Sequence, residues 1–485
     1  MGKEIISDEL VLKQLEQYRF PGMGVGVIKD GEVLLCKGYG YRDLESRLPI
    51  TENTQWGIAS CSKAFTATLA GILSDEDVID LDRPIKEYLP DFRMYDSFAS
   101  AQCTLRDMLC HRTGLGGYDA LWCDEGLTRE DLWKRLRYLE PNMPFRSAPQ
   151  YSNLIYAMAG HVMEKVTGRT WDDLIKEKLF EPIGMTSSNT SVDDMLKSPD
   201  FATPYWQSEK GPVRIKNWNV DLGGPAASVN STLSDMLKWL QFNIDGGVTK
   251  DGRRLLSEET HRLIHTPQVP YRIWPWDFPE VPPVGQYAMG WYDDVYRGYP
   301  LYFHIGEIEG YGTMQWVLPG QKLGIVVFNN IHKPCVLIET AVAWSIIDSV
   351  LGLPAVNWAD RLYEQRNNYG NLLEHWALDL TSGDSAEETP LSHKQEDYTG
   401  IYENPGHGPI RISFGKDGWI CEYRGVNQKM EHCFYDTFRV PDVKMDTLLV
   451  TAPLTFIAGD DGMIDRFEFR LYPQVDPIIF KKNKV

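Results

Sequence analysis

Ser60 and Lys63 stand three residues apart in the segment QWGIASCSKAFTATLAGIL, which reads as the start of a helix. A serine hydroxyl is a weak nucleophile until a neighbouring base takes its proton, and residues three apart share one face of a helix. The pair therefore predicts acyl transfer through Ser60, with Lys63 as a base or proton shuttle. The plain alternative is that Ser60 only caps the helix. A second match, Ser413 with Lys416, runs into a hairpin turn, where the two side chains need not share a face.

Two later motifs could complete such a site. Tyr151 and Asn153 stand at the start of a second predicted helix, in the triplet YSN. His304 and Gly306 lie on a predicted strand that leads into the glycine-rich turn EIEGYG. A Ser-x-x-Lys helix, a polar triplet at a helix start and a late strand follow one another in this order in β-lactamases and penicillin-binding proteins.

The elements that must position these motifs can be read from the periodicity of apolar residues. GMGVGVIKDGEVLLCKGYGYRD alternates apolar residues around a Lys-Asp-Gly turn, which predicts a β-hairpin over residues 22–43. The segment SNLIYAMAGHVMEKVTG predicts a helix that ends at Gly168 as its C-cap. A further helix is predicted in STLSDMLKWLQFNIDGG, with Ser231 as the candidate N-cap.

Strands follow between residues 302 and 329, and a last helix is predicted over about 334–351. Helices in the middle of the sequence with strands at both ends indicate an α+β fold, whose antiparallel sheet is assembled from segments distant in sequence. An insert before His304, residues 266–303, is rich in Trp, Tyr and Pro. Its aromatic side chains are either part of the core or part of a substrate-binding loop.

The C-terminal part of the chain has a different character. The segment LDLTSGDSAEETPLSHKQ is polar and acidic, as linkers are, and short alternating strands follow it, as in a small all-β barrel. We therefore predict a catalytic domain over residues 1–360, a helix end and acidic linker over 361–395, and a β-barrel domain over 396–485.

By these motifs the chain resembles the serine β-lactamase-like family, which includes class C β-lactamases, penicillin-binding proteins and related esterases, D-aminopeptidases and acyltransferases. The segments LRDMLCHRTGL, KLFEPIGM and GGPAASVNSTLSDMLKWL resemble further landmarks of that family, in the family's order. The end of the chain, through EHCFYDTFRV, resembles the lipocalin-like module that many members carry. The resemblance implies an antiparallel sheet flanked by helices, an all-helical lobe and a small C-terminal barrel.

The resemblance also implies roles for the residues of the first two motifs. Ser60 would be the acylated nucleophile, Lys63 a base or proton shuttle, and Tyr151 the group that passes a proton to the leaving group. Whether Lys63 or Tyr151 takes the serine proton stays open. Asn153 would position Lys63 and the substrate carbonyl or amide. His111, in the turn after LRDMLC, is expected to be structural, because a turn histidine more often holds backbone groups.

On the late strand, the resemblance implies that the backbone N–H groups of Ser60 and Glu307 form an oxyanion hole. Gly306 would be needed because a side chain there would block the acyl group. The chain departs from the family at His304 and Ile305, where β-lactamases carry Lys-Thr to grip a carboxylate. A mostly neutral histidine makes efficient penicillin hydrolysis doubtful and favours an esterase, amidase or acyltransferase. The resemblance implies that this position lies beside Tyr151, so we expect His304 to be catalytic by hydrogen bonding to the Tyr151 hydroxyl or the substrate carbonyl.

Three functions follow as hypotheses. The leading one is a serine hydrolase that cleaves an ester or amide bond of a small apolar compound or short peptide. The second is an acyltransferase or macrocyclising thioesterase of natural-product biosynthesis that forms the same acyl-enzyme from a thioester, either free or bound to a carrier protein. The third is a catalytically inactive binding or assembly protein, and the intact set of Ser60, Lys63 and Tyr151 argues against it.

Composition narrows the partners further. With 49 basic and 68 acidic residues among 485, the net charge is −19, which repels nucleic-acid phosphates and anionic lipid surfaces. The eight cysteines show no metal-site spacing, so we expect reduced and mostly buried thiols, no metal and no cofactor. The first 20 residues predict an amphipathic helix without a signal-peptide core, so we expect a cytoplasmic protein.

Overall fold

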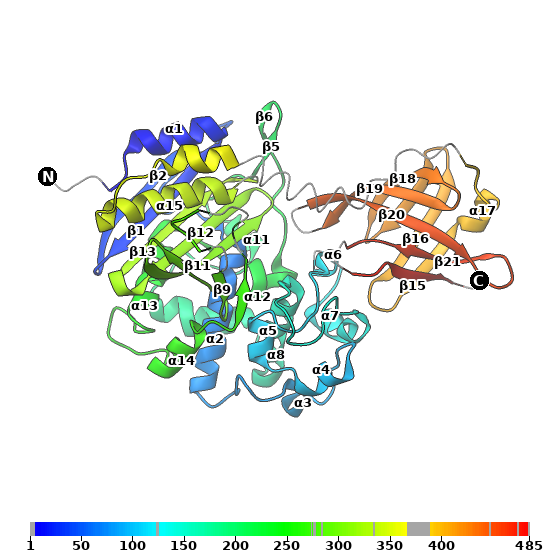
Figure 1. The fold of residues 1–485 in the computed structure, drawn as a ribbon, viewed down its shortest axis with the longest axis horizontal. Helices are drawn as coiled ribbons and strands as arrows, with labels where there is room; N and C mark the ends of the chain where they lie inside the picture. The colour runs from blue at the N-terminus through cyan, green and yellow to red at the C-terminus, as the bar shows by residue number, and fades with distance from the viewer. Residues whose placement is uncertain are drawn as a thin grey trace.

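The computed structural model describes residues 5–122, 126–272, 274, 278–282, 285–332, 335–365, 389–445, 448–472 and 475–483. A sheet flanked by helices and a helical lobe make up most of the molecule, and a barrel at the C-terminus lies beside the lobe (Figure 1). This arrangement confirms the predicted α+β class with a small C-terminal barrel.

The central sheet contains nine antiparallel strands among the described residues, in the order β3-β2-β1-β13-β12-β11-β10-β9-β8. Their bounds are β1 Gly22–Lys29, β2 Glu32–Asp43, β3 Leu48–Pro49, β8 Val269–Tyr271, β9 Gly285–Tyr287, β10 Tyr292–Tyr296, β11 Tyr299–Ile308, β12 Tyr311–Leu318 and β13 Leu323–Asn329. The N-terminal hairpin joins the late strands through β1 and β13, where Val25 pairs with Val327. The sheet is thus assembled from distant segments, as the sequence predicts.

The hairpin turn has its predicted geometry. Asp30 and Gly31 both have positive φ, 52° and 84°, as a two-residue hairpin loop requires. Along β1 the glycines alternate with apolar residues for a packing reason. A Cβ on Gly24 would lie 3.2 Å from Leu233, and one on Gly26 would lie 3.2 Å from Leu237, so these glycines let the helix α13 (Leu233–Ile244) lie close to the sheet.

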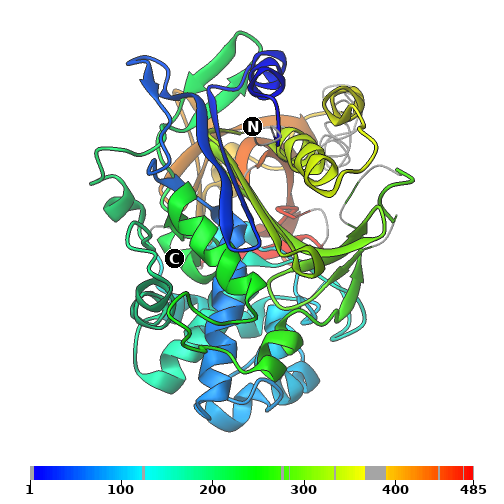
Figure 2. The same ribbon diagram turned by 90° about the vertical axis from the view of Figure 1, so that its left-hand side faces the viewer.

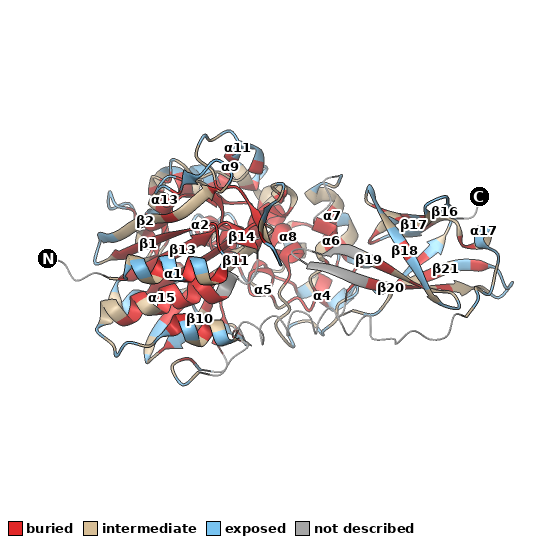
Figure 3. Cartoon of the chain, turned by 90° about the horizontal axis from the view of Figure 1, so that it is seen from above, coloured by how far each residue is buried: buried red, intermediate tan, exposed pale blue. Residues whose placement is uncertain are grey.

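Helices cover both faces of the sheet. α1 (Asp8–Tyr18) and α15 (Cys335–Leu351) pack on one face, and α13 lies on the other, as the edge-on view in Figure 2 shows. Strand β13 contributes side chains to the hydrophobic clusters on both faces of the sheet. Ile325 and Val327 belong to the cluster under α15, and Val326 and Phe328 belong to the cluster on the opposite face. Figure 3 shows the resulting layer of buried residues along the sheet.

The helical lobe lies below the sheet in Figure 1. The remaining helices among the described residues, most of them in this lobe, are α2 Ser62–Asp75, α3 Ile85–Tyr88, α4 Ser97–Gln102, α5 Leu105–Leu109, α6 Asp119–Trp122, α7 Arg129–Arg135, α8 Asn153–Thr167, α9 Trp171–Ile175, α10 Glu181–Ile183, α11 Val192–Met195, α12 Gly224–Ala227, α14 Glu258–Ile264 and α17 Gln395–Tyr398. The shorter turns are η1 Ala59–Cys61, η2 Leu136–Tyr138, η3 Lys176–Phe180, η4 Asp221–Gly223 and η5 Pro319–Gln321, and the small strands are β4 Trp56–Gly57, β5 Tyr205–Ser208, β6 Gly211–Arg214, β7 Asn230–Ser231 and β14 Ile331–His332.

The helix ends bear out the sequence signals with one correction. α8 is capped by Ser152, whose side chain accepts the Ile155 N–H, and it ends at Gly168 with φ 70°. The predicted N-cap Ser231 is wrong. Ser231 lies in β7, and Thr232 caps α13 by accepting the Asp235 N–H, because pairing of β7 with β4 draws Ser231 into a strand.

The aromatic insert before His304 forms strands at one edge of the sheet. β8, β9 and β10 come from it, and Trp274 is buried, stacks on Phe303 and donates its Nε1–H to Asp294. Tyr287 and Tyr292 are buried as well. Core packing therefore accounts for these side chains, while parts of the insert lie outside the described residues.

The C-terminal strands close into a barrel in the order β15-β16-β17-β18-β19-β20-β21-β22. Their bounds are β15 Gly400–Asn404, β16 Gly408–Gly415, β17 Gly418–Tyr423, β18 Val426–Phe434, β19 Thr437–Met445, β20 Leu448–Ala458, β21 Ile464–Phe469 and β22 Ile478–Lys482. Ser413 and Lys416 lie where β16 turns into β17, as expected of a hairpin. Residues 366–388 of the predicted linker lie outside the described residues, and the predicted domain boundaries stay predictions.

Among the described residues, no helix is both long and apolar enough to cross a membrane.

Candidate active site

Ser60 and Lys63 meet at the start of the α2 helix. Ser60 lies in the single turn η1, and Lys63 lies in the first turn of α2, so three residues bring their side chains to one face. Lys63 Nζ is 2.8 Å from Ser60 Oγ. Ala59, directly before Ser60, has φ 48°, a conformation that costs a non-glycine residue energy and that recurs at functional sites.

Lys63 is fully buried and has two further oxygen neighbours. Its Nζ lies 2.7 Å from Asn153 Oδ1 and 3.1 Å from the main-chain oxygen of Ala226. The Tyr151 ring lies beside it, with its centroid 4.7 Å from Nζ. The structure thus brings Ser60, Lys63, Tyr151 and Asn153 together from segments up to about ninety residues apart, as the sequence predicts.

Asp119 is a site residue that the sequence reasoning missed. Asn153 donates from Nδ2 to Asp119 Oδ1 at 3.3 Å, which turns the Asn153 oxygen toward Lys63, and Trp122 donates to the same carboxyl oxygen at 2.8 Å. Burial raises the pKa of Asp119, against the lowering effect of these bonds and of Lys63. No motif marks Asp119, because its role depends on a contact between α6 and α8 that spacing alone does not reveal.

His111 holds the segment that carries Tyr151, as a structural histidine would. It is fully buried, its Nδ1 accepts the Ser152 N–H at 3.1 Å, and its main-chain oxygen accepts the Gln150 N–H at 2.8 Å. Both neighbours of Tyr151 are therefore bonded to one residue, and the imidazole and Tyr151 rings lie 4.3 Å apart. Burial and the charge of Lys63 lower the pKa of His111 well below its ordinary value, so the ring is neutral.

His304 lies inside the sheet beside this cluster. It is fully buried on β11, with Nδ1 2.7 Å from the Ile305 carbonyl oxygen and Nε2 3.1 Å from the Tyr287 hydroxyl. Burial, followed by the charge of Lys63, lowers the pKa of His304 to about 3. Its ring centroid is 6.5 Å from that of Tyr151.

Gly306 lies where β11 touches η1. A Cβ there would be 2.2 Å from the Ile58 main-chain oxygen and 3.2 Å from the Cys61 nitrogen. The steric need for glycine at this position therefore comes first from the protein itself. Beyond Phe303 the described pairs of β11 with β10 end, so the edge from His304 to Glu307 faces the turn that carries Ser60.

None of the described residues forms a group of three or more His, Cys, Asp or Glu side chains placed to hold a metal ion. The six cysteines whose side chains are described are free thiols, four of them buried.

Comparison with protein families and curated sequences places this site in a known context. A family model described as Beta-lactamase matches residues 8–341, and one described as a domain of unknown function, DUF3471, matches residues 384–482. Among curated proteins, the unguisins hydrolase ungD' of Aspergillus campestris is 28% identical over 361 residues, which cover 71% of this chain and 64% of that protein. The chain thus spans slightly less than two thirds of that relative. Penicillin-binding protein 4 of Amycolatopsis lactamdurans is 26% identical, over 65% of this chain and 82% of that protein.

Solved structures share the fold. The octameric penicillin-binding protein homologue from Pyrococcus abyssi matches 98% of this chain and 99% of its own, with a TM-score of 0.60 and 20% identity. The D-amino acid amidase from Ochrobactrum anthropi SV3 matches 71% of this chain and 97% of its own, with a TM-score of 0.60 and 20% identity.

Proposed function

The chain belongs to the beta-lactamase family, and on that premise we propose that it is a serine hydrolase that forms an acyl-enzyme on Ser60. Its substrate is an ester or amide of a small apolar compound or a short peptide. The observation that carries the proposal is the contact of Ser60 Oγ with a buried lysine, Lys63 Nζ, at 2.8 Å.

Three oxygen atoms that contact Lys63 differ in whether they carry a proton for a hydrogen bond. The side-chain oxygen of Asn153 and the main-chain oxygen of Ala226 only accept, whereas the Ser60 hydroxyl can also donate. A neutral Lys63 donates to the two carbonyl oxygens and keeps its lone pair for the Ser60 proton. A charged Lys63 donates to all three. The surroundings therefore suit both protonation states through which a base passes.

The positions of these groups support the following course of reaction. Ser60 Oγ attacks the substrate carbonyl carbon as its proton passes to Lys63 or Tyr151, and the N–H groups of Ser60 and Glu307 receive the negative oxygen. Tyr151, which is partly exposed as Ser60 is, returns a proton to the leaving amine or alcohol. Water attacks the carbonyl carbon of the ester on Ser60 and gives up a proton to Lys63 or Tyr151. The bond from that carbon to Ser60 Oγ then breaks, Oγ takes the proton back, and the acid leaves.

The lack of charge on His304 supports a substrate without a carboxylate at this position. A pKa of about 3 leaves the imidazole uncharged at pH 7, so this position supplies no cation for a substrate carboxylate. The names of the two unguisins hydrolases among the relatives favour hydrolysis over transfer to another acceptor.

The test is loss of the nucleophile. Ser60→Ala is expected to lower turnover of every substrate more than about a hundredfold while the protein stays folded, because Lys63 keeps its contacts with the oxygens of Asn153 and Ala226. Intact-mass spectrometry across p-nitrophenyl esters, D- and L-aminoacyl amides, thioesters and β-lactams should find one acyl group on wild type and none on the variant. Residual activity above a hundredth would place the nucleophile elsewhere.

A further inference from the structure

The C-terminal barrel packs against the helical lobe at the loop that leads into α6. The Tyr118 ring packs against two barrel side chains, with its centroid 5.0 Å from Tyr472 and 5.6 Å from His407, and the two barrel rings lie 6.0 Å from each other. All three side chains are almost fully buried. The buried residues of barrel and lobe form one continuous hydrophobic cluster, so the barrel is joined to the lobe by a packed core.

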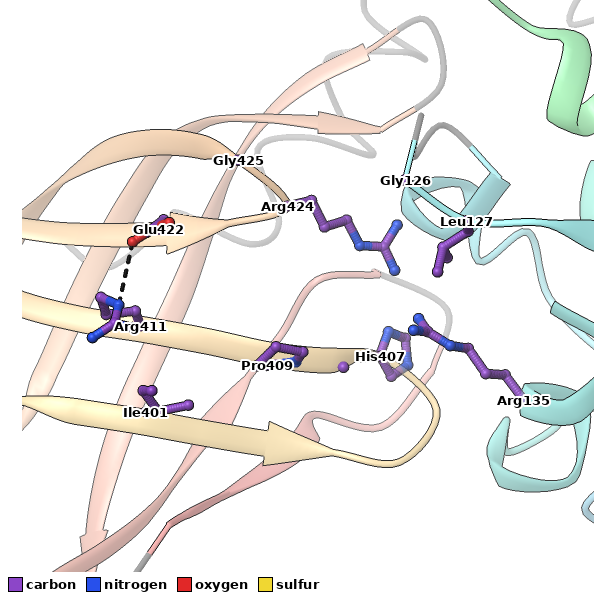
Figure 4. Close-up of a pocket in the computed structure, with 11 residues that line it drawn as sticks. Gly126, Leu127, Arg135, Ile401, His407, Pro409, Arg411, Glu422, Arg424 and Gly425 are labelled. Carbon is purple, nitrogen blue, oxygen red and sulfur yellow. Dashed lines mark ion pairs between the residues drawn. The ribbon is translucent and has the colours of Figure 1, made fainter. Parts of the chain in front are cut away.

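Polar side chains extend this contact at the edge of the barrel. Arg135, on the lobe, points at His407, and Arg424 reaches from the barrel toward Leu127, as Figure 4 shows. They line a cavity of about 380 Å³ beside the packed rings. Directly before His407, a Cβ on Gly406 would lie 3.0 Å from Leu139 of the lobe, so the backbone of the barrel touches the lobe closely.

Tyr118 is held in a conformation that needs support. Its φ is 47°, a conformation that costs an aromatic residue energy and persists only where the surrounding contacts hold it. Its hydroxyl donates to the Glu140 main-chain oxygen at 2.6 Å, and the two barrel rings pack against its ring. The next residue is Asp119, the first residue of α6.

Asp119 carries the contact to the reacting groups. It accepts from Asn153 Nδ2, and Asn153 Oδ1 lies 2.7 Å from Lys63 Nζ. The path from barrel to base is therefore Tyr472, Tyr118, Asp119, Asn153 and Lys63, each in contact or in sequence with the next. A lost ring at Tyr472 would leave Tyr118 partly unsupported and would free Asp119 to shift, and small shifts of such groups lower rates strongly.

We propose that the barrel is part of the catalytic unit, with Tyr472 a positioning residue that fixes Asp119, and through it Asn153 and Lys63, by packing on Tyr118. This assigns a role to a domain that matches a family of unknown function. The inference rests on the proposed function, since it concerns the rate at which Ser60 is acylated.

The test compares two full-length variants. Tyr472→Ala removes the ring, and we expect kcat and the acylation rate of Ser60 to fall about tenfold or more while KM changes less than about threefold. Tyr472→Phe keeps the ring, and we expect it to restore the rate. Tyr402→Phe is the control for barrel stability, because it removes a bond to the Tyr398 carbonyl within the barrel and leaves Tyr118 untouched. It should leave kcat unchanged.

A double variant tests the path. If Tyr472 acts through Asp119, Tyr472→Ala adds little to the loss caused by Asp119→Ala, whereas independent effects would multiply. Thermal melting checks that each variant is folded, and Tyr472→Leu replaces the alanine variant if that one is not. Equal acylation of wild type and folded Tyr472→Ala, or multiplying losses, would overturn the inference. Absence of any acyl group on wild-type Ser60 would instead overturn the proposed function.

Discussion

Both ring nitrogens of His304 are used inside the protein. The Ile305 carbonyl only accepts, so Nδ1 carries the proton and Nε2 accepts from the Tyr287 hydroxyl. This fixes the neutral tautomer and leaves the ring no proton to give at neutral pH. We infer that His304 acts by shape and orientation beside Lys63, and the predicted bond from His304 to the Tyr151 hydroxyl or substrate stays a prediction.

Removal of the His304 ring should therefore disturb the proton path. We expect His304→Ala to lower kcat on neutral esters by about 10²-fold, because it opens space next to Lys63 and releases Tyr287. The measurement is steady-state hydrolysis of p-nitrophenyl esters, with folding checked by thermal melting. Tyr287→Phe removes only the hydroxyl that bonds Nε2 and should cost less. Undiminished hydrolysis by His304→Ala would mean that the motif assigned to His304 and Gly306 lies on another strand.

At the scale of elements, the sequence predicts what is local. The Asp-Gly turn at 30–31 fixes the hairpin, Ser152 and Gly168 fix α8, and the three-residue spacing of Ser60 and Lys63 fixes their common face. These outcomes depend on residues that are neighbours in the chain. The cap of α13 was misplaced by one residue, because the pairing of β7 with a distant strand decides it.

Contacts between elements are what the sequence does not reveal. Asp119 carries no motif, yet it orients Asn153. The insert before His304 has too much proline for a confident strand pattern, yet it adds edge strands to the sheet. The predicted need for glycine at position 306, room for the acyl group, stays a prediction, and the structure shows a different reason, the Ile58 main-chain oxygen beside it.

Gly306→Ala separates those two reasons. An added Cβ 2.2 Å from the Ile58 oxygen must push β11 away from η1, so we expect both a loss of acylation of about tenfold or more and a loss of about 1–3 kcal/mol in the free energy of unfolding. Blocking of the acyl group alone would lower activity and leave stability unchanged. Gly320→Ala, in η5, is the control, because nothing lies within 4 Å of its added Cβ. Acylation rates and urea unfolding measure the two effects.

At the scale of the whole molecule, the contact between barrel and lobe includes a buried, neutral histidine, His407. Burial, with the charges of Arg424 and Arg135, lowers the pKa of His407 to about 3. On the far side of the sheet, burial raises the pKa of Glu339 well above its ordinary value, so the folded protein keeps this carboxyl protonated to a higher pH than the unfolded chain does. When the chain unfolds, His407 takes up a proton and Glu339 releases one, so the free energy of unfolding should depend on pH in opposite directions for the two groups.

The signs follow from proton binding. Below pH 6.5 the unfolded chain protonates His407 while the folded protein does not, so its contribution to stability is complete above pH 6.5 and is lost as the pH falls toward 3. Glu339 does the reverse, because the unfolded chain ionises it above pH 4.5 while the folded protein keeps the proton. Its contribution is complete below pH 4.5 and is lost as the pH rises.

Two variants isolate these effects from all other groups. Relative to wild type, His407→Gln should gain about 1.4 kcal/mol in the free energy of unfolding for each pH unit lowered from 6.5 to 4.5, since glutamine does not titrate. Relative to wild type, Glu339→Gln should gain stability as the pH is raised above 4.5, because glutamine has no proton to release on unfolding. Urea unfolding at pH 4.5, 5.5 and 6.5 measures both differences. Parallel pH profiles for wild type and His407→Gln would show that His407 is protonated in the folded protein, and that the junction between barrel and lobe admits a charge it is here predicted to exclude.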